Sequence, residues 1–398
     1  MKDIYLDHAA TTYVDPRVLE VMLPYFSDIY ANPSSFHTPG LRSKEAVIEA
    51  RAAIAKCVNA RESEIIFTSG GTESNNLAIL GTIRAHAAMG KHVITTAIEH
   101  HSVLETLMHY QKTGEIELTI LPVDRDGIVS VKSVEEALRP DTILISVMMA
   151  NNEIGTIQPI ADIGRALLKW RKEHTTTFPY FHSDACQAGG TLDLDVLQSH
   201  LDLMTVNSSK IYGPKGIGML YIRRGVKIAP MIRGGGQEQN LRSGTENVPG
   251  IIGFATALTL AQAEKETENA RLTKLRDRLI EGLLMIPKTR LNGHATKRLP
   301  NNANISFIDI EGEAAVLYLD AEGVYVSTGS ACASASLDPS HVILATGLSY
   351  EGAHGSIRFT LGKRTTAEDI ERVIKVMPGV VEKLRHMSPV NLDMKYFS

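Results

Sequence analysis

Short apolar runs that end abruptly at polar residues recur along the chain and alternate with segments of helical periodicity. Thr142–Met149 (TILISVMM) is almost continuously apolar, which is typical of a strand with both faces covered. The other runs that we predict to be strands of the same sheet are Glu64–Ser69, His92–Thr96, Ile116–Val123, Tyr180–Ser183 and Leu203–Val206. This alternation predicts an α/β fold with a mostly parallel central sheet, and such sheets bind ligands outside the carboxyl ends of their strands.

A long helical segment indicates where the chain divides. The 398 residues exceed one ordinary domain, and leucines at helical spacing predict one helix from about Ile251 to Met285. After it we predict strands at Ile305–Ile308, Val324–Val326 and Ser356–Leu361. The pattern Thr365-x-x-Glu368 is typical of a capping box at the start of a last helix. We predict a large domain of residues 16–260 and a smaller α+β domain formed by residues 1–15 and 261–398.

Composition argues against several classes of protein. The formal net charge is −4, and no block of like charge indicates a nucleic-acid or membrane surface. The first residues, MKDIYLDHAATT, lack the apolar centre of a signal peptide, and no uncharged apolar run is long enough to span a bilayer. Cys57, Cys186 and Cys332 have unrelated spacings, which fit neither a disulfide framework nor a four-cysteine zinc site. We expect a cytoplasmic protein with reduced thiols, no nucleic-acid partner and no resident metal.

The glycines that follow the first strand form a candidate phosphate site. Glu64–Ser69 runs into Gly70-Gly71-Thr72, and a predicted helix begins directly afterwards. Glycines let the backbone approach an anion, and the free N–H groups of a helix start point at it. The stretch matches neither the Walker pattern nor the dinucleotide pattern. The alternative is that Thr72 or Ser74 simply caps the helix.

One lysine follows the last strand of this region. In Met204–Gly216 (MTVNSSKIYGPKG) an apolar run stops at a small polar cluster, and Lys210 precedes a glycine–proline turn. A lysine held in this way loses its proton readily when it is desolvated, and it can then bind an aldehyde covalently. The alternative is a surface loop in which Lys210 and Lys215 only improve solubility.

Taken together, the residues at the strand ends match the requirements of pyridoxal phosphate. This coenzyme needs an anion cradle, a lysine for its aldehyde and a carboxylate beside its pyridine nitrogen. Gly70–Thr72, Lys210 and Asp184 would supply these groups, while His100 offers a flat ring and Gln187 a donor to the ring oxygen. Singly, Asp184 could be a helix cap, Gln187 a surface residue and His100 a core histidine. Their joint occurrence in this order favours the coenzyme.

The chain resembles the cysteine desulfurases of the NifS/IscS type, within the class V aminotransferase group, nearly from end to end. Its fold would then be that of a fold type I pyridoxal-phosphate enzyme. The motifs that carry the resemblance are YLDHAATT (5–12), NPSS (32–35), FTSGGTESNN (67–76), NNEIGTIQPI (151–160), SDACQA (183–188), KIYGPKG (210–216), GGGQEQNLRSGT (234–245), STGSACASASLDPSHV (327–342) and SIRFTLG (356–362).

The resemblance implies a role for each coenzyme-binding residue. Lys210 would hold the coenzyme covalently and later move the substrate α-proton. His100 would stack on the pyridine ring and assist proton transfer. The remaining contacts would come from Asp184 at the pyridine nitrogen, Gln187 at the ring hydroxyl, Gly71 and Thr72 at the phosphate, Asn152 beside the coenzyme, and Thr245 from the neighbouring subunit of a homodimer.

The resemblance also implies how L-cysteine is bound and where its sulfur goes. Asn152 and Arg358 would hold the substrate carboxylate, for which the planar arginine fork is suited, and Asn32 would contact the substrate backbone. Cys332 would take the sulfur as a persulfide and leave alanine. From composition alone, the small residues around Cys332 predict an exposed mobile loop, and its attack requires a thiolate with a base or cation nearby.

Two positions depart from the family pattern. The family usually places Ser-x-His directly before the lysine, whereas this chain has Asn207, Ser208 and Ser209. Asn207 and Ser209 can still donate to a phosphate, but with less charge than an imidazole. Cys186 occupies a position where small or apolar residues are common, and we interpret it as a small core residue close to the coenzyme.

Several interpretations remain to be separated. The runner-up enzyme is a selenocysteine lyase or related β-eliminating lyase, which would depend less on Cys332, and a plain aminotransferase would have no use for a loop thiol. A catalytically lapsed sulfur-assembly scaffold is the non-enzymatic alternative, supported only by the change at Asn207–Ser209. The resemblance implies delivery of sulfur to an iron–sulfur scaffold protein or to tRNA thiolation. Cys332 would ligate an iron–sulfur cluster only in a partner complex.

Overall fold

The computed structural model describes residues 3–328, 338–389 and 391–392 of the chain. Its centre is a seven-stranded sheet with the order β2-β8-β7-β6-β5-β3-β4. The strands are β2 (Ile65–Thr68), β3 (His92–Thr96), β4 (Glu117–Leu121), β5 (Thr142–Ser146), β6 (Tyr180–Asp184), β7 (Leu203–Asn207) and β8 (Gly218–Ile222). β3 to β7 pair in parallel, so the predicted α/β fold with a mostly parallel sheet is confirmed.

β8 is a strand that lies outside those predicted from the apolar runs. It lies between β2 and β7 and is antiparallel to both. All five of its residues are buried, which agrees with the apolar letters GMLYI. Only a short turn separates β8 from Lys210, and this allows the chain to fold back beside β7.

Helices cover both faces of the seven-stranded sheet. Alternate residues of one strand point to opposite faces, so Leu144 packs with α4 and α5, whereas Ile145 packs with α3, α7 and α8. The helices of this half are α1 (Pro16–Met22), α2 (Pro24–Ser27), α3 (Thr38–Cys57), α4 (Gly71–His86), α5 (His101–Lys112), α6 (Val131–Ala137) and α7 (Ile160–Glu173), with 3₁₀ turns at Glu62–Glu64 and Glu238–Asn240. This arrangement explains why the inner strands are buried on both faces, whereas β4, at the edge of the sheet, is partly exposed.

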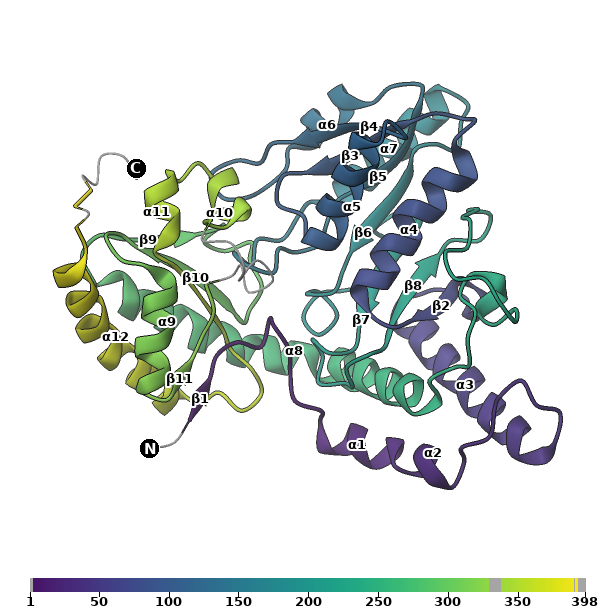
Figure 1. Cartoon of the computed structure of the whole chain (residues 1–398), viewed down its shortest axis with the longest axis horizontal. Coiled ribbons are helices and arrows are strands. Elements are labelled where there is room, and N and C mark those ends of the chain that lie inside the picture. The colour runs from purple at the N-terminus through teal and green to yellow at the C-terminus, as the bar shows by residue number, and fades with distance from the viewer. Residues whose placement is uncertain (1–2, 329–337, 390, 393–398) are drawn as a thin grey trace.

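A second, smaller core lies at the other end of the long helix α8 (Val248–Leu284) (Figure 1). Its antiparallel sheet has the order β12-β10-β9, and β1 pairs in parallel with β11. The elements are β1 (Ile4–Tyr5), β9 (Thr289–Asn292), β10 (Asn302–Phe307), β11 (Val324–Tyr325), β12 (Ser356–Thr360), α9 (Gly312–Ala321), α10 (His341–Ala345), α11 (Tyr350–His354) and α12 (Ala367–Met387). Ala261 belongs to the larger core and Leu272 to the smaller one, while the division into residues 16–260 and the remainder stays a prediction.

The capping box of α12 lies one residue later than the sequence pattern indicates. Thr366, not Thr365, is the N-cap: its hydroxyl accepts from the Asp369 backbone N–H, and the Asp369 carboxylate accepts from the Thr366 N–H. Aspartate replaces the expected glutamate because its shorter side chain still reaches back across the first turn. Thr365 instead accepts from the Gly362 N–H with its hydroxyl. Among the described residues, no helix has both the length and the apolarity needed to cross a bilayer.

Candidate active site

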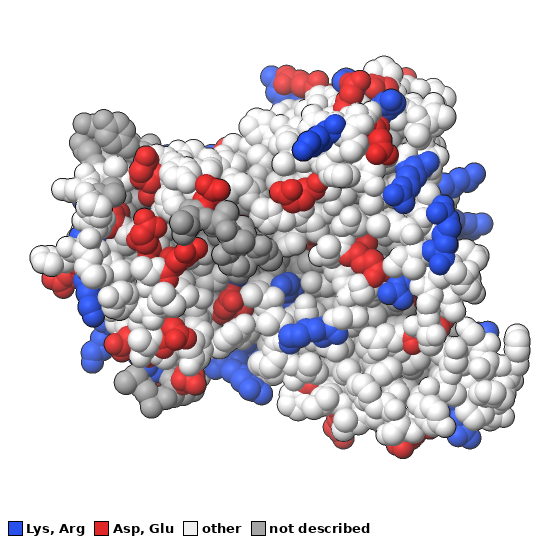
Figure 2. Space-filling model, viewed as in Figure 1, with Lys and Arg blue, Asp and Glu red and all other residues white. Residues whose placement is uncertain are grey.

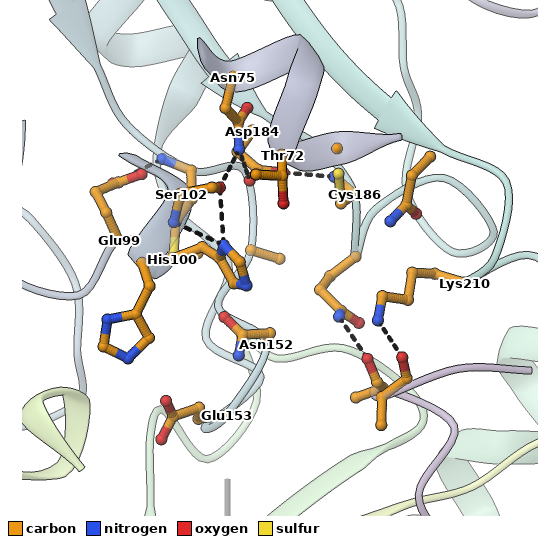
Figure 3. Close-up of a pocket in the computed structure, with 18 of the residues that line it drawn as sticks. Thr72, Asn75, Glu99, His100, Ser102, Asn152, Glu153, Asp184, Cys186 and Lys210 are labelled. Atoms are coloured by element: carbon orange, nitrogen blue, oxygen red, sulfur yellow. Dashed lines mark hydrogen bonds between the residues drawn. The ribbon is translucent and has the colours of Figure 1, made fainter. Parts of the chain in front are cut away.

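A cavity of about 280 Å³ opens at the carboxyl ends of the parallel strands, between the two halves of the molecule. The predicted site residues that line it are Gly71, Thr72, His100, Asn152, Asp184, Gln187, Asn207, Lys210 and Arg358. Figure 3 shows His100 between Asp184 and Asn152, with Lys210 at the side of the same pocket and its amine directed at the Ala10 carbonyl. Lysine or arginine atoms are visible in the hollow at the centre of Figure 2, so the site offers positive charge to an anionic ligand.

Asp184, the last residue of β6, is a buried carboxylate whose hydrogen bonds point it at the cavity. Its Oδ2 accepts from Asn75 Nδ2 at 2.7 Å, and its Oδ1 accepts from the Cys186 backbone N–H at 2.9 Å. No arginine or lysine is paired with it among the described ion pairs. Because a buried carboxylate is costly without a cationic partner, this position suits a protonated pyridine nitrogen.

His100 is held in one orientation and one tautomer at the start of α5. Its Nδ1 accepts the backbone N–H of Ser102 at 3.1 Å and lies 2.8 Å from Ser102 Oγ. Because a backbone N–H only donates, Nδ1 carries no proton and the neutral ring carries its proton on Nε2. Burial lowers the pKa of His100, which favours this neutral form. The ring therefore presents a flat face and an Nε2–H to the cavity.

The glycine turn before α4 is shaped to receive an anion. Gly70 has a φ of +149°, which favours glycine, and no heavy atom lies within 4 Å of the position that a Cβ would take. A Cβ on Gly71 would lie only 2.7 Å from Cys186 Sγ. Beside this turn, Asn207 Oδ1 is buried without a partner among the described residues. A phosphate accepts hydrogen bonds, so the groups that fit it are the free N–H groups at the start of α4 and the Nδ2 amide of Asn207 rather than its Oδ1.

Lys210 lies three residues beyond the end of β7 and is fixed against the N-terminal segment. Its Nζ donates to the carbonyl oxygen of Ala10, and Gln187 Nε2 donates to the neighbouring Ala9 carbonyl at 3.1 Å. The Thr12 backbone N–H bonds to the Ser209 carbonyl at 2.9 Å, which ties the same segment to the lysine turn. The lysine is thus positioned by structure rather than free in solvent.

Arg358 on β12 is buried and preoriented for a second carboxylate. It is 3% exposed, and its Nη2 lies 2.7 Å from Asp7 Oδ1. Its Nη1 donates to the Asn152 carbonyl at 3.2 Å, while its buried Nε has no partner among the described residues. An unsatisfied buried guanidinium N–H is costly, so a ligand carboxylate at this position would relieve that cost.

Four predicted residues are not brought to this cavity. Ser209 contributes its backbone carbonyl to the Thr12 contact, Asn32 Oδ1 accepts from the Ser34 N–H, and Thr245 is exposed. None of these three lines the cavity. The fourth, Cys332, lies outside the described residues. Cys186, interpreted above as a core residue, is only partly buried and lines the cavity, where burial raises the pKa of its thiol well above the usual value.

Several lining residues are not among those predicted from the sequence. They are Asn75, Glu99, His101, Ser102, Glu153 and His341. Asn75 stands one helical turn after Gly71, so the phosphate motif itself contains the signal for a second inward-facing side chain. His341 carries no such signal, because it reaches the cavity from α10 in the other half of the molecule.

Glu99 is a buried acid whose charge depends on pH. Its Oε1 accepts from Thr96 Oγ1 at 2.7 Å and from the Met148 N–H at 2.9 Å, whereas Oε2 has no partner among the described residues. Burial raises the pKa of Glu99 to about 8. The folded protein therefore keeps this proton to a higher pH than the unfolded chain does, and the free energy of unfolding falls as pH rises from about 4.5 to about 8.

Glu99→Gln should remove the part of this pH dependence of stability that comes from Glu99, because glutamine is neutral and keeps the acceptor oxygen. Between pH 5.5 and pH 7.5, the free energy of unfolding of the coenzyme-free variant should rise by about 2 kcal/mol relative to that of the parent, since one pKa unit corresponds to ~1.4 kcal/mol. Urea unfolding at both pH values measures the difference. Glu105→Gln, at an exposed position of α5, is the matched control. Parallel pH dependences of Glu99→Gln and the parent would show that Glu99 is ionised throughout.

The family model described as "Aminotransferase class-V" matches residues 4–373. The protein named "Cysteine desulfurase IscS" of Methanosarcina thermophila is 53% identical, covering 98% of this chain and 94% of that protein. The protein of the same name from Dictyoglomus turgidum is 50% identical, and the match covers 99% of this chain and 98% of that protein.

Two solved structures extend the comparison to three dimensions. One titled "NIFS-LIKE PROTEIN" has a TM-score of 0.89 and 37% identity, covering 96% of this chain and 100% of that one. Another, titled "SspA in complex with cysteine", has a TM-score of 0.78 and 36% identity, and the match covers 90% of this chain and 98% of that one.

Proposed function

Because the chain belongs to the class V aminotransferase family and is a pyridoxal-phosphate-dependent cysteine desulfurase, we propose that it passes the sulfur of L-cysteine to Cys332 and releases L-alanine. The observation that carries the proposal is one cavity that joins Asp184, Lys210 and the glycine turn to the buried Arg358. When bound there, pyridoxal phosphate supplies an electron sink that weakens the bonds to the substrate α-carbon and the C–S bond. The protein's part is to orient both molecules and to move protons.

The coenzyme contacts follow from the side chains that line the cavity. Asp184, which accepts a hydrogen bond from Asn75, would pair with the pyridine nitrogen, and His100 would supply a flat ring beside the coenzyme. Lys210 would bind the coenzyme aldehyde and would move the substrate α-proton. The phosphate would be held by the N–H groups of Gly71 and Thr72, with Asn207 beside them, and Gln187 would contact the ring hydroxyl.

The substrate carboxylate is assigned to Arg358 and Asn152. Asp7 fixes the guanidinium plane from one side, and the Asn152 carbonyl accepts from Nη1, so the unpartnered Nε is left for the ligand. A planar guanidinium held in one orientation binds a carboxylate in one defined geometry, which a flexible lysine ammonium would not do. Asn32 is proposed to complete substrate binding from the exposed loop before α3.

The assignment of Cys332 as the sulfur acceptor is supported by the described residues on either side of it. Before it, Ser327 forms a backbone bridge with Arg358, with the Arg358 N–H 2.7 Å from the Ser327 carbonyl oxygen. After it, Ser340 Oγ donates to Glu153 Oε2 at 2.5 Å. Both ends of the segment that carries Cys332 are thus held by residues that line the cavity.

A product assay tests this function. The coenzyme-loaded protein should form one molecule of alanine for each sulfur atom removed from L-cysteine, with the sulfur first retained on the protein. Release of free sulfide with an equal amount of pyruvate would instead indicate a β-eliminating lyase.

The functional unit is proposed to be a homodimer. Thr245 is exposed and does not line the cavity of its own chain, so a phosphate contact from it requires a second copy. The surface of α1 to α3 offers a face for that copy, since it exposes many large apolar side chains. These residues are Leu19, Val21, Leu23, Phe26, Tyr30, Phe36, Leu41 and Ile48.

Thr245→Ala should weaken coenzyme binding by about tenfold, because one phosphate hydrogen bond to a charged group is worth about 1.5 kcal/mol. Equilibrium dialysis of the coenzyme measures the change, and sedimentation shows whether the dimer persists. Thr256→Ala is the matched control, since that hydroxyl donates to the Ile252 carbonyl within α8. Unchanged coenzyme affinity in a dimeric Thr245→Ala protein would contradict the role.

We further propose a cytoplasmic location and delivery of sulfur to an iron–sulfur scaffold protein or to tRNA thiolation. The names of the curated relatives support delivery to an iron–sulfur scaffold protein. The described cysteines, Cys57 and Cys186, are free thiols, which suits a reducing compartment.

A further inference from the structure

Asn75 on α4 is a buried amide that contacts two other elements of the site. It is 1% exposed, and its Nδ2 donates to Asp184 Oδ2 at 2.7 Å and to Ser102 Oγ at 2.8 Å. Ser102 Oγ in turn lies 2.8 Å from His100 Nδ1. Figure 3 shows the resulting chain of hydrogen bonds, which runs from Asp184 through Asn75 and Ser102 to His100. We call its two middle residues, Asn75 and Ser102, the bridge.

The direction of each hydrogen bond in the bridge follows from the chemistry of its groups. His100 Nδ1 accepts the Ser102 backbone N–H at 3.1 Å and carries no proton, so the Ser102 hydroxyl is the donor in their 2.8 Å contact. The oxygen of that hydroxyl accepts one hydrogen of Asn75 Nδ2, and the other hydrogen goes to Asp184. Both amide hydrogens are therefore used, and the hydrogen bonds run outward from Asn75 in both directions.

This orientation of the Asn75 amide leaves one buried atom unsatisfied. Its Oδ1 is buried without a partner among the described residues, which costs stability. Turning the amide over would place Oδ1 against the Asp184 carboxylate, where two acceptors repel each other. The observed orientation instead donates to the carboxylate and so favours its ionised form. The unsatisfied oxygen is explained if the donor is needed at Asp184.

We propose that the two residues of the bridge are positioning residues, which keep Asp184 ionised and His100 neutral with its proton on Nε2. This inference rests on the proposed function, in which Asp184 pairs with the pyridine nitrogen and His100 supplies a flat ring beside the coenzyme. An ionised carboxylate is the form that favours a protonated pyridine nitrogen. Protonation of His100 Nδ1 would break both hydrogen bonds that it accepts from Ser102, so the ring stays neutral.

Other titratable groups also influence His100. Burial has the largest effect and lowers the pKa of His100, the nearby carboxylates raise it, and the nearby cationic groups lower it further. These groups are the same in the parent and in a variant that lacks only the Ser102 hydroxyl, so a difference between the two reports the bridge. They are Asp184, Glu153, His101 and Lys210, together with Glu99, Cys186, His341 and Arg358, which line the same cavity.

Histidine NMR tests the bridge directly. Full-length coenzyme-free protein with isotope-labelled histidine is titrated from about pH 5 to pH 8, and His100→Gln identifies the signals of His100. The nitrogen chemical shifts show which ring nitrogen carries the proton, and the neutral parent ring should carry it on Nε2. Ser102→Ala should raise the titration midpoint of His100 by about 0.7 pH unit, because the neutral ring loses one hydrogen bond.

Two further substitutions on α5 serve as controls. Ser102→Thr keeps the hydroxyl and should keep the parental midpoint. Thr106→Ala removes a hydroxyl that donates to the Ser102 carbonyl, from a residue that does not line the cavity, and should also titrate as the parent does. A parental midpoint in Ser102→Ala, or a neutral parent ring with its proton on Nδ1, would overturn the proposal.

Asn75→Leu tests the other arm of the bridge, because leucine has a similar volume but cannot donate. Equilibrium dialysis should show about tenfold weaker coenzyme binding, since Asp184 loses a hydrogen bond that stabilises its charge. The His100 midpoint should also rise, and adding Asn75→Leu to Ser102→Ala should raise it no further, because both substitutions act through the same contact. Weaker coenzyme binding in both single variants with unmoved midpoints would indicate a purely structural role and contradict the proposal.

The proposed function is tested apart from the bridge. If the coenzyme-loaded parent makes no alanine from L-cysteine, that function is wrong, whereas the titration of His100 in the coenzyme-free protein still decides whether the bridge controls the ring. If the parent makes alanine and Ser102→Ala titrates as the parent does, only the bridge fails.

Discussion

Replacing Lys210 with arginine should abolish alanine formation, with a loss of at least about a thousandfold. Arginine keeps the positive charge but stays protonated at every working pH, so it can neither bind the coenzyme aldehyde nor move the α-proton. Lys210 follows β7 and its Nζ donates to the Ala10 carbonyl, an oxygen to which an arginine guanidinium can also donate. We therefore expect a folded protein without covalently held coenzyme.

Borohydride reduction followed by peptide mass spectrometry measures the covalent bond. The parent should carry the coenzyme on the Lys210 peptide, and Lys210→Arg should carry none. Lys215→Arg is a close control, because Lys215 lies in the same turn and donates to the Thr12 carbonyl at 3.2 Å but does not line the cavity. Coenzyme attached to another lysine of an active Lys210→Arg protein would show that the site has been assigned wrongly.

Cys332→Ser should also lose alanine formation by about a thousandfold or more while keeping the bound coenzyme. Serine has nearly the same size, but its hydroxyl is a poor nucleophile at neutral pH. The other two thiols are unsuited to replace it, since burial raises the pKa of both Cys57 and Cys186. A thiol with a raised pKa holds little thiolate at pH 7, and the thiolate is the attacking species.

Product analysis of three variants checks this result. Cys57→Ser and Cys186→Ser should both make alanine, whereas Cys332→Ser should not, and the visible absorbance of the coenzyme should remain in all three. Continued turnover of Cys332→Ser would favour the lyase. A loss of activity in Cys186→Ser with an active Cys332→Ser would move the sulfur acceptor into the cavity itself.

The parts of the site that follow strand ends can be predicted from the amino-acid sequence. Apolar runs mark the strands, so the sequence pattern alone places Asp184 and Lys210 at one edge of the sheet. The family motifs add residues such as Arg358, which pattern alone does not distinguish from a surface arginine. The start of α12 differs from its predicted position by one residue, because Thr365 and Thr366 both have the chemistry of a cap and only backbone geometry decides between them.

Contacts between distant segments could not be predicted. Asp7 meets Arg358 across almost the whole sequence, and His341 reaches Glu99 from the other half of the molecule. No local periodicity encodes such pairs, since they depend on how the two halves pack. Thr245 and Asn32 are a different case, because the structure of one chain does not bring them to its own cavity.

The most direct test of the proposed mechanism is to find where the sulfur goes after a single turnover. Coenzyme-loaded protein is mixed with one equivalent of L-cysteine without reductant, and its peptides are examined by mass spectrometry while alanine is quantified. The mechanism predicts one additional sulfur atom on the Cys332 peptide for each alanine formed. Alanine formation with no added sulfur on Cys332, or with the sulfur on Cys186, would contradict it.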